Sequence, residues 1–204
     1  EEHFFQRSIP DSETERILSQ LRRETQNIVL IGMPGCGKST VGAALAALTG
    51  REAIDIDQRI EARAGCSIPE IFAQGGEAAF RALEQEETAL AGACSGKILL
   101  TGGGVVTVEA NYASLHQNGR IYHLLRSLDT LATDGRPLSQ GADLGAMWQR
   151  RAPLYARFRD AEADNNGPAE ETAAAIWRDF CVHCGTERSE SEHAGHPAAG
   201  DLRT

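Results

Sequence analysis

Gly32-Met33-Pro34-Gly35-Cys36-Gly37-Lys38-Ser39 is the stretch that decides the fold. It fits the pattern Gly-x-x-x-x-Gly-Lys-Ser/Thr of a phosphate-binding loop. The apolar run at 28–31 precedes it and is typical of a strand buried on both faces. A helix pattern from Lys38 to Leu48 follows, with Val41, Leu45 and Leu48 on one apolar side, and Gly50 ends it. A strand, this loop and a helix in that order predict a site where backbone N–H groups and a helix N-terminus hold phosphates.

Each residue of this loop has a predicted task in binding ATP. Lys38 is expected to reach the β- and γ-phosphates, and the Ser39 hydroxyl to bind Mg²⁺. The glycines let successive N–H groups face the phosphates, and Cys36 is interpreted as a small residue that donates its N–H. The predicted nucleotide-binding residues of the loop are Gly35, Cys36, Gly37, Lys38, Ser39 and Thr40.

Short apolar strands alternate with helix patterns outward from the loop. Further strands are predicted at 53–55, 98–100 and 121–124, and a fifth at 161–163, where strand propensity is poor. Helices are predicted at 60–64, from Ser67 onward, and at 77–94, 144–158 and 170–180. This alternation predicts an α/β fold of three α/β/α layers, with a five-stranded parallel sheet between the helices.

Composition excludes several classes of protein. Of the 204 residues, 20 are Lys or Arg and 29 are Asp or Glu, which gives a net charge of −9. A chain this acidic is a poor candidate for broad nucleic-acid binding, so no nucleic acid is expected as a partner. No apolar run reaches about 18 residues, so no membrane span is predicted. The five cysteines have scattered spacings and the N-terminus is not a signal peptide, which favours a reducing cytoplasm.

Three regions differ in composition along the chain. Residues 1–26 are a polar extension with one helix pattern that Asp11 or Ser12 could cap, 27–180 form the domain, and 181–204 are interpreted as a flexible tail or linker. A metal clip built from Cys181, His183 and Cys184, with His193 and His196 further on, is the alternative for the tail. The chain does not begin with Met, and its polar flanks fit a processed chain or a module of a multifunctional one. A monomer is expected.

Two acids follow the second predicted strand. Asp55 and Asp57 flank Ile56, and ligands of parallel sheets bind at the carboxyl ends of the strands. Asp55 is expected to hold water on Mg²⁺, and Asp57 to accept a substrate hydroxyl and take its proton. The alternative for Asp57 is that it caps the helix before Ile60.

Three arginines stand in motif-like surroundings: Arg81 after Gly75-Gly76, Arg136 before Pro137-Leu138, and Arg151 before Ala152-Pro153. A lone arginine is usually a solvated surface group. Beside a phosphate loop, guanidinium groups serve two further purposes, to neutralise a transferring phosphoryl group and to hold a carboxylate in a bidentate fork.

Taken together, these motifs resemble the shikimate kinase family over about residues 27–180. The motifs that carry the resemblance are the phosphate loop, Asp55-Ile56-Asp57, Ser67-Ile68-Pro69-Glu70-Ile71-Phe72, Phe80-Arg81-Ala82-Leu83-Glu84, Thr101-Gly102-Gly103-Gly104, Arg136-Pro137-Leu138 and Arg151-Ala152-Pro153-Leu154-Tyr155. The resemblance implies a P-loop NTPase fold of nucleoside-monophosphate-kinase type. It also implies transfer of the γ-phosphoryl group of ATP to the 3-hydroxyl of shikimate, in the chorismate route to aromatic amino acids.

The resemblance also implies roles for single residues. Asp57 matches the acid that binds shikimate hydroxyls, and Arg81 and Arg151 match the pair that holds the shikimate carboxylate. Arg136 matches a lid arginine that closes over the ATP phosphates, and Glu84 an acid that orients the substrate arginines. The remaining substrate-binding matches are Phe72, Phe80, Gly102, Gly103 and Gly104, of which Gly103 contacts the substrate through its backbone.

The chain departs from the family pattern at two places. The lid segment 131–135 has no second arginine, so one adenine or phosphate contact is missing unless Arg126 supplies it. Residues 164–168 replace an arginine-containing turn that covers the adenine. Two other functions stay open, a different small-molecule kinase of the gluconate-kinase kind and an inactive nucleotide-binding regulator. A GTPase is disfavoured because the chain has no Asn-Lys-x-Asp motif.

Overall fold

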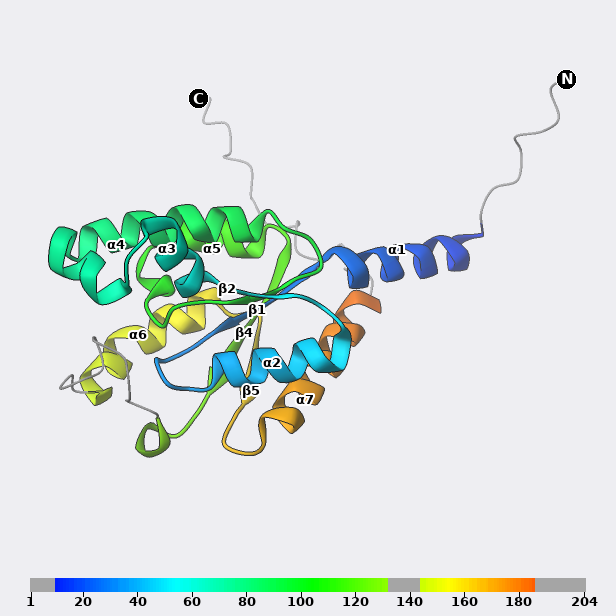
Figure 1. Cartoon of the computed structure of the whole chain (residues 1–204). Helices are drawn as coiled ribbons and strands as arrows, with labels where there is room; N and C mark the ends of the chain where they lie inside the picture. The colour runs from blue at the N-terminus through cyan, green and yellow to red at the C-terminus, as the bar shows by residue number, and fades with distance from the viewer. Residues whose placement is uncertain (1–9, 132–143, 186–204) are drawn as a thin grey trace, which may run out of the picture.

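A five-stranded sheet forms the centre of the computed structural model, which describes residues 10–131 and 144–185 (Figure 1). All of its strand pairs are parallel, and the strand order is β2-β3-β1-β4-β5. The strands are β1 (Asn27–Ile31), β2 (Ala53–Asp55), β3 (Ile98–Leu100), β4 (Gly119–Leu125) and β5 (Ala161–Asp164). All five predicted strands are therefore confirmed, including the one with poor strand propensity.

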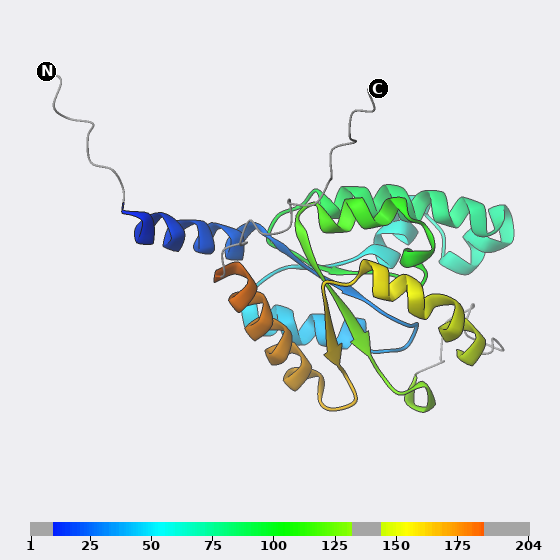
Figure 2. The same ribbon diagram turned by 180° about the vertical axis from the view of Figure 1, so that it is seen from behind.

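Helices cover both faces of this sheet, so the expected three-layer α/β/α architecture is confirmed. The helices are α1 (Asp11–Thr25), α2 (Lys38–Thr49), α3 (Ile56–Ala64), α4 (Ile68–Gly92), α5 (Ala110–His116), α6 (Leu144–Phe158) and α7 (Ala169–Gly185), with the short turns η1 (Val105–Thr107) and η2 (Leu128–Thr130). Helices α2 and α7 pack on one face, and α4 and α5 on the other (Figures 1 and 2). The central strand β1 is buried along its whole length, as its unbroken apolar sequence requires.

Helix α4 begins as its sequence predicts and is then interrupted. Ser67 and Glu70 form a capping box at its start, with Pro69 in the first turn. Gly76 breaks the helix with φ 68° and ψ −170°, a conformation that glycine adopts without strain. The two separately predicted helices, one from Ser67 and one from Glu77, are thus consecutive segments of α4.

Some expectations at helix ends are wrong. Helix α1 begins after Pro10 without a side-chain cap, so neither Asp11 nor Ser12 serves as one. Leu48 is 51% exposed rather than packed, because it lies on the outer side of α2 near the end of that helix. The segment α5 was not expected, since its seven residues carry little apolar periodicity.

The C-terminal helix continues past the expected start of the tail. Residues 181–185 belong to α7, and Cys184 is fully buried, with its Sγ 3.7 Å from Gln26 Oε1. Within the described ranges no group of three or more His, Cys, Asp or Glu side chains is placed to hold a metal ion, so the Cys181–His183–Cys184 clip has no support. His193 and His196 lie outside the described residues.

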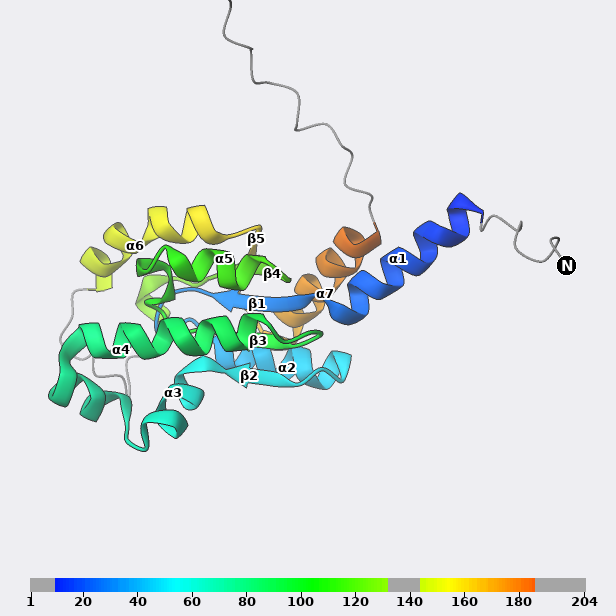
Figure 3. The same ribbon diagram turned by 90° about the horizontal axis from the view of Figure 1, so that it is seen from above.

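The end of the N-terminal extension is attached to the domain, although α1 itself has no buried residue. Arg51 Nη1 donates to the Gln26 carbonyl at 2.7 Å, and Gly96 N–H to the Thr25 carbonyl at 2.7 Å. Helix α1 lies beside the C-terminal end of α7 and points away from the sheet (Figure 3). No helix in the described part of the chain is both long and apolar enough to cross a membrane.

Candidate active site

The phosphate loop joins β1 to α2 at the carboxyl edge of the sheet. Gly35 and Gly37 have positive φ of 81° and 95°, which explains the glycines of the motif. Lys38 is buried, and its Nζ donates to the Gly32 carbonyl at 2.8 Å and the Met33 carbonyl at 3.0 Å. The ammonium group is therefore already held inside the curve of the loop.

The first turn of α2 opens to solvent beyond this loop. Ser39 and Thr40 are both exposed, as expected of residues that contact a ligand rather than the core. Cys36 is buried, and its N–H donates to the Met33 carbonyl at 3.2 Å. Gly37 caps α2 in a left-handed conformation.

The turn between β5 and α7 supports the phosphate loop from the side. Asn165 Nδ2 donates to the Cys36 carbonyl at 2.7 Å, and Thr172 Oγ1 donates to Asn165 Oδ1 at 3.0 Å. A Cβ at Gly37 would lie 2.6 Å from Asn165 Nδ2 and 3.4 Å from Arg126 Nη1. Arg126, the candidate replacement for the missing lid arginine, therefore lies next to the loop. Sequence reasoning missed Asn165, because a contact over 129 positions leaves no local signal.

The two acids after β2 take different positions. Asp55 caps α3 by accepting a hydrogen bond from the Gln58 N–H at 3.3 Å. The alternative that Asp57 is the cap is therefore wrong, because α3 begins at Ile56, four residues earlier than expected. Asp57 faces the glycine turn after β3, where a Cβ at Gly102 would lie 2.7 Å from its Oδ1. Both acids are at the carboxyl edge of the sheet, as their place in the sequence predicted.

The three glycines after β3 are each packed against a different part of the site. Any Cβ at Gly103 would lie 2.6 Å from Pro34 Cδ in the phosphate loop, and one at Gly104 would collide with the guanidinium of Arg81. The Gly103 carbonyl accepts hydrogen bonds from Arg151 Nη1 at 3.1 Å and Tyr155 Oη at 2.6 Å. This glycine turn therefore lies between the phosphate loop, α4 and α6, and brings Arg81 and Arg151 to neighbouring peptides.

Carboxylates surround Arg81. Its Nη1 donates to Glu84 Oε2 at 2.6 Å, and its Nε and Nη2 donate to Glu77 Oε1 at 3.2 and 3.0 Å. Glu84 is 0% exposed, and burial raises the pKa of its carboxyl above the ordinary value although Arg81 and Arg151 oppose this. Its second oxygen, Oε1, has no hydrogen-bond partner in the described structure.

Two aromatic side chains accompany Arg81 on α4. Phe72 and Phe80 come from opposite sides of the break at Gly76, and their rings stack with centroids 4.9 Å apart. The Arg81 guanidinium lies over the Phe80 ring, 5.2 Å from its centroid. The break in α4 thus brings together two residues that were expected to line one pocket.

A histidine that sequence reasoning missed lies beneath the phosphate loop. His123, on β4, is buried, and its ring stacks on Tyr155 at 4.6 Å and on Trp148 at 6.0 Å. A Cβ at Gly32 would lie 3.6 Å from its Cδ2. Burial lowers the pKa of His123 to about 4, and the charges of Arg159 and Lys38 act in the same direction. A single histidine in an apolar strand gives no sequence signal for this position.

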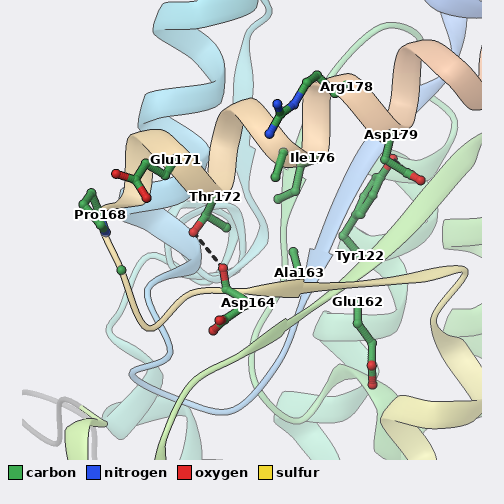
Figure 4. A pocket seen from close by; sticks show the side chains of 12 residues that line it. Tyr122, Glu162, Ala163, Asp164, Pro168, Glu171, Thr172, Ile176, Arg178 and Asp179 are labelled. Atoms are coloured by element: carbon green, nitrogen blue, oxygen red, sulfur yellow. Dashed lines mark hydrogen bonds between the residues drawn. The ribbon is translucent and has the colours of Figure 1, made fainter.

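Two cavities in the described structure differ in chemistry. A pocket of about 270 Å³ beside the phosphate loop has Cys36, Arg126, Trp148 and Asn166 in its wall. A larger one of about 460 Å³ lies between β5 and α7, where Glu162, Asp164, Glu171 and Asp179 contribute carboxylates (Figure 4). The acidic wall of the larger pocket disfavours phosphate there, and it shares no residue with the phosphate loop. Arg136 lies in 132–143, outside the described residues.

Comparisons with known proteins agree on one family. The sequence model of the family described as shikimate kinase matches residues 34–180. A shikimate kinase of Xanthomonas oryzae pv. oryzae is 41% identical over 163 residues, which is 74% of this chain and 91% of that protein. One from Moorella thermoacetica is 38% identical over 162 residues, 76% of this chain and 91% of that protein. The structure of shikimate kinase from Acinetobacter baumannii in complex with shikimate matches with a TM-score of 0.72 and 30% identity, covering 81% of this chain and 98% of that one.

Proposed function

The chain belongs to the shikimate kinase family, and we propose that the residues around its phosphate loop and glycine turn transfer the γ-phosphoryl group of ATP to the 3-hydroxyl of shikimate. The single observation that carries this assignment is the packing of Gly103 directly against Pro34, since a Cβ at Gly103 would lie 2.6 Å from the proline. The phosphate loop and the arginines that would hold an acceptor carboxylate thus share one wall. Such closeness is needed because phosphoryl transfer depends on positioning and charge neutralisation.

The acceptor would bind at the glycine turn. Arg81 and Arg151 would hold the shikimate carboxylate, because guanidinium groups match a carboxylate in a planar, charge-assisted pair. Arg151 is already oriented by the Gly103 carbonyl at 3.1 Å, and Arg81 by Glu84 at 2.6 Å. Phe72 and Phe80 would supply the apolar wall beside the ring of the substrate. The backbone of Gly102–Gly104 would come close to the substrate, which a Cβ would prevent.

The reacting hydroxyl would be aligned by Asp57. This acid lies beside Gly102 on the same side as Glu84, so the two carboxylates face the acceptor site together. Asp57 would accept a hydrogen bond from the hydroxyl and take its proton as the phosphoryl group arrives. Glu84 would orient Arg81, and its Oε1 has room for one more donor.

The nucleotide would lie along the phosphate loop. The N–H groups of Gly35–Gly37 and the start of α2, with Thr40, would hold the phosphates, and Lys38 would exchange its loop carbonyls for phosphate oxygens. Arg136 would close over the phosphates as a lid residue. Arg126 is exposed beside Gly37 and is suited to a phosphate or adenine contact in place of the second lid arginine.

The donor set near the loop fits a magnesium ion. Ser39 offers an exposed hydroxyl, and Asp55 a partly exposed carboxylate at the edge of the sheet, so both are hard oxygen ligands of the kind that Mg²⁺ prefers. Ser39 would bind the ion directly and Asp55 through water. When bound, the ion would neutralise phosphate charge on the nucleotide.

Turnover measurements test the proposed function. ADP release should require both ATP and shikimate, and gluconate should not replace shikimate, because an open, flexible chain would pack less well against Phe72 and Phe80 than a rigid ring does. Lys38→Ala should abolish turnover while the far-UV circular dichroism spectrum is retained. Equal turnover with gluconate would favour the other kinase class, and ADP release from neither acceptor would favour an inactive regulator.

Cellular setting and assembly extend this proposal. The net charge of −9 supports small-molecule partners rather than nucleic acid. We further propose that the protein is a cytoplasmic monomer. The cytoplasmic location is supported by the scattered free cysteines, because a reducing compartment keeps cysteines free. Light scattering on the purified chain would test the monomer.

A further inference from the structure

Glu77 occupies the donor edge of Arg81 that a ligand carboxylate needs. One oxygen of Glu77 accepts from both Nε and Nη2 of Arg81, at 3.2 and 3.0 Å. The other end of the guanidinium donates to Glu84, at 2.6 Å. The Nε–Nη2 edge presents two parallel N–H groups, which is the geometry for a bidentate carboxylate. Arg81 therefore has a carboxylate at each end before any ligand is considered.

The two glutamates differ in how readily they can leave. Glu84 is 0% exposed, whereas the Glu77 side chain is 66% exposed. Glu77 also directly follows the break at Gly76, so it begins the second segment of α4 and has no helical turn before it. A side chain in this place can rotate into water with little cost, because an exposed ion pair contributes little. Glu84 is the fixed partner of Arg81, and Glu77 the exchangeable one.

We propose that Glu77 is an internal stand-in for the carboxylate of the substrate, which holds Arg81 in the absence of shikimate and gives way when shikimate binds. This inference rests on the proposed function, in which Arg81 binds the shikimate carboxylate. Glu77 is a positioning residue that acts through Arg81. It sets the affinity for shikimate by competition, and it favours anions, because an uncharged ligand cannot replace the ion pair that it would have to break.

If Glu77 competes with shikimate, its removal should change the shikimate Kd in the direction opposite to the removal of a residue that binds shikimate. Removing Glu77 should tighten shikimate binding, since the ligand no longer has to displace a neighbour. The effect on affinity is limited because the Glu77 side of the Glu77–Arg81 ion pair is exposed to water. We expect a twofold to fivefold lower Kd for shikimate. Damage to the fold or loss of a productive Arg81 orientation would instead weaken binding.

Equilibrium binding of shikimate to the intact chain tests this proposal. Isothermal titration calorimetry with Glu77→Ala and Glu77→Gln should show the lower Kd, with the larger change for alanine, which leaves no side-chain acceptor at the Nε–Nη2 edge of Arg81. The methyl ester of shikimate should bind with the same Kd to wild type and both variants, because it has no carboxylate to compete. Glu15→Gln on α1 is the matched control, since it removes one exposed acid away from the site and should leave the Kd unchanged.

The outcomes separate this inference from the function on which it rests. If Arg81→Ala leaves the shikimate Kd unchanged, the assigned role of Arg81 fails, and the role of Glu77 fails with it. If Arg81→Ala weakens binding while the Glu77 variants bind shikimate no more tightly than wild type, Arg81 keeps its role and only the competition is refuted. Equal tightening for shikimate and its methyl ester would also refute it.

Discussion

Protonation of His123 should destabilise the protein between pH 6.5 and pH 4. Burial, against Tyr155 and Trp148, lowers the pKa of this histidine from 6.5 to about 4. Over this pH interval His123 is therefore protonated in the unfolded chain and neutral in the folded chain. The stability linked to neutral His123 is complete above pH 6.5 and is lost as the pH falls toward 4. The charges of Lys38 and Arg159 act on the pKa of His123 in the same direction as burial, so they do not reverse the sign.

The size of the effect follows from the same two values. Each pH unit in this interval changes the free energy of unfolding by about 1.4 kcal/mol, so the loss at pH 4.5 is about 2.5 kcal/mol relative to pH 7.5. The ring is only 1% exposed, so solvent screening reduces this little. With an m-value of about 2 kcal/mol/M, the urea midpoint should fall by about 1 M more in wild type than in a protein without the titration.

His123→Phe is the reference variant, because phenylalanine keeps an aromatic ring in contact with Tyr155 and Trp148 but cannot be protonated. Urea unfolding followed by tryptophan fluorescence at several pH values between 4.5 and 7.5 gives both stability curves. Other acids and histidines titrate in both proteins, so the difference between the curves isolates His123. Curves that stay parallel from pH 7.5 to pH 4.5 would refute the argument that His123 is held neutral.

Two further predictions concern the acceptor site and the end of the fold. Arg151→Lys should weaken shikimate binding by about tenfold or more in calorimetry, because it loses a charge-assisted fork worth about 1.5–3 kcal/mol, and Arg81→Lys should do the same. ATP affinity should stay within about twofold in both variants, since neither residue belongs to the phosphate loop. An unchanged shikimate Kd would contradict the assignment of Arg81 and Arg151 as the pair that binds the shikimate carboxylate. A chain ending at residue 180 should be less stable in urea than one ending at residue 185 by about 1–2 kcal/mol, because it lacks the fully buried Cys184. Identical urea midpoints for these two chains would instead support a C-terminal domain boundary at residue 180.

Strands and the phosphate loop could be predicted because their signals are local. The apolar run at 28–31 and the glycines of the loop need no distant partner to be recognised. The start of α3 could not be placed, because Asp55 and Asp57 are equally good caps by sequence and only packing decides between them. Propensity gave only weak support for β5, which forms because the last four residues of β4, Tyr122 to Leu125, offer it a parallel partner.

Contacts between distant segments account for the missed site residues. Asn165 reaches the phosphate loop over 129 positions, and His123 meets Tyr155 only because β4 and α6 pack together. Glu77 lies four residues before Arg81 on one helix, so the pair was visible in principle. It was not singled out, because such pairs on helix surfaces are usually solvated and carry no function.

A net-negative chain that binds two anionic substrates has to concentrate its positive charge. Arg81 and Arg151 meet at one glycine turn, and this turn packs on the phosphate loop that contains Lys38. Each of the three cations is held by an acceptor, Lys38 and Arg151 by carbonyls and Arg81 by carboxylates. Cations arranged in this way need not be reoriented when a ligand arrives, because the ligand oxygen replaces an acceptor already present. The Gly103 peptide lies where these groups meet, between Pro34 on one side and Arg151 with Tyr155 on the other. A shift of this peptide on shikimate binding would therefore move the phosphate loop as well, since no Cβ-sized gap separates Gly103 from Pro34.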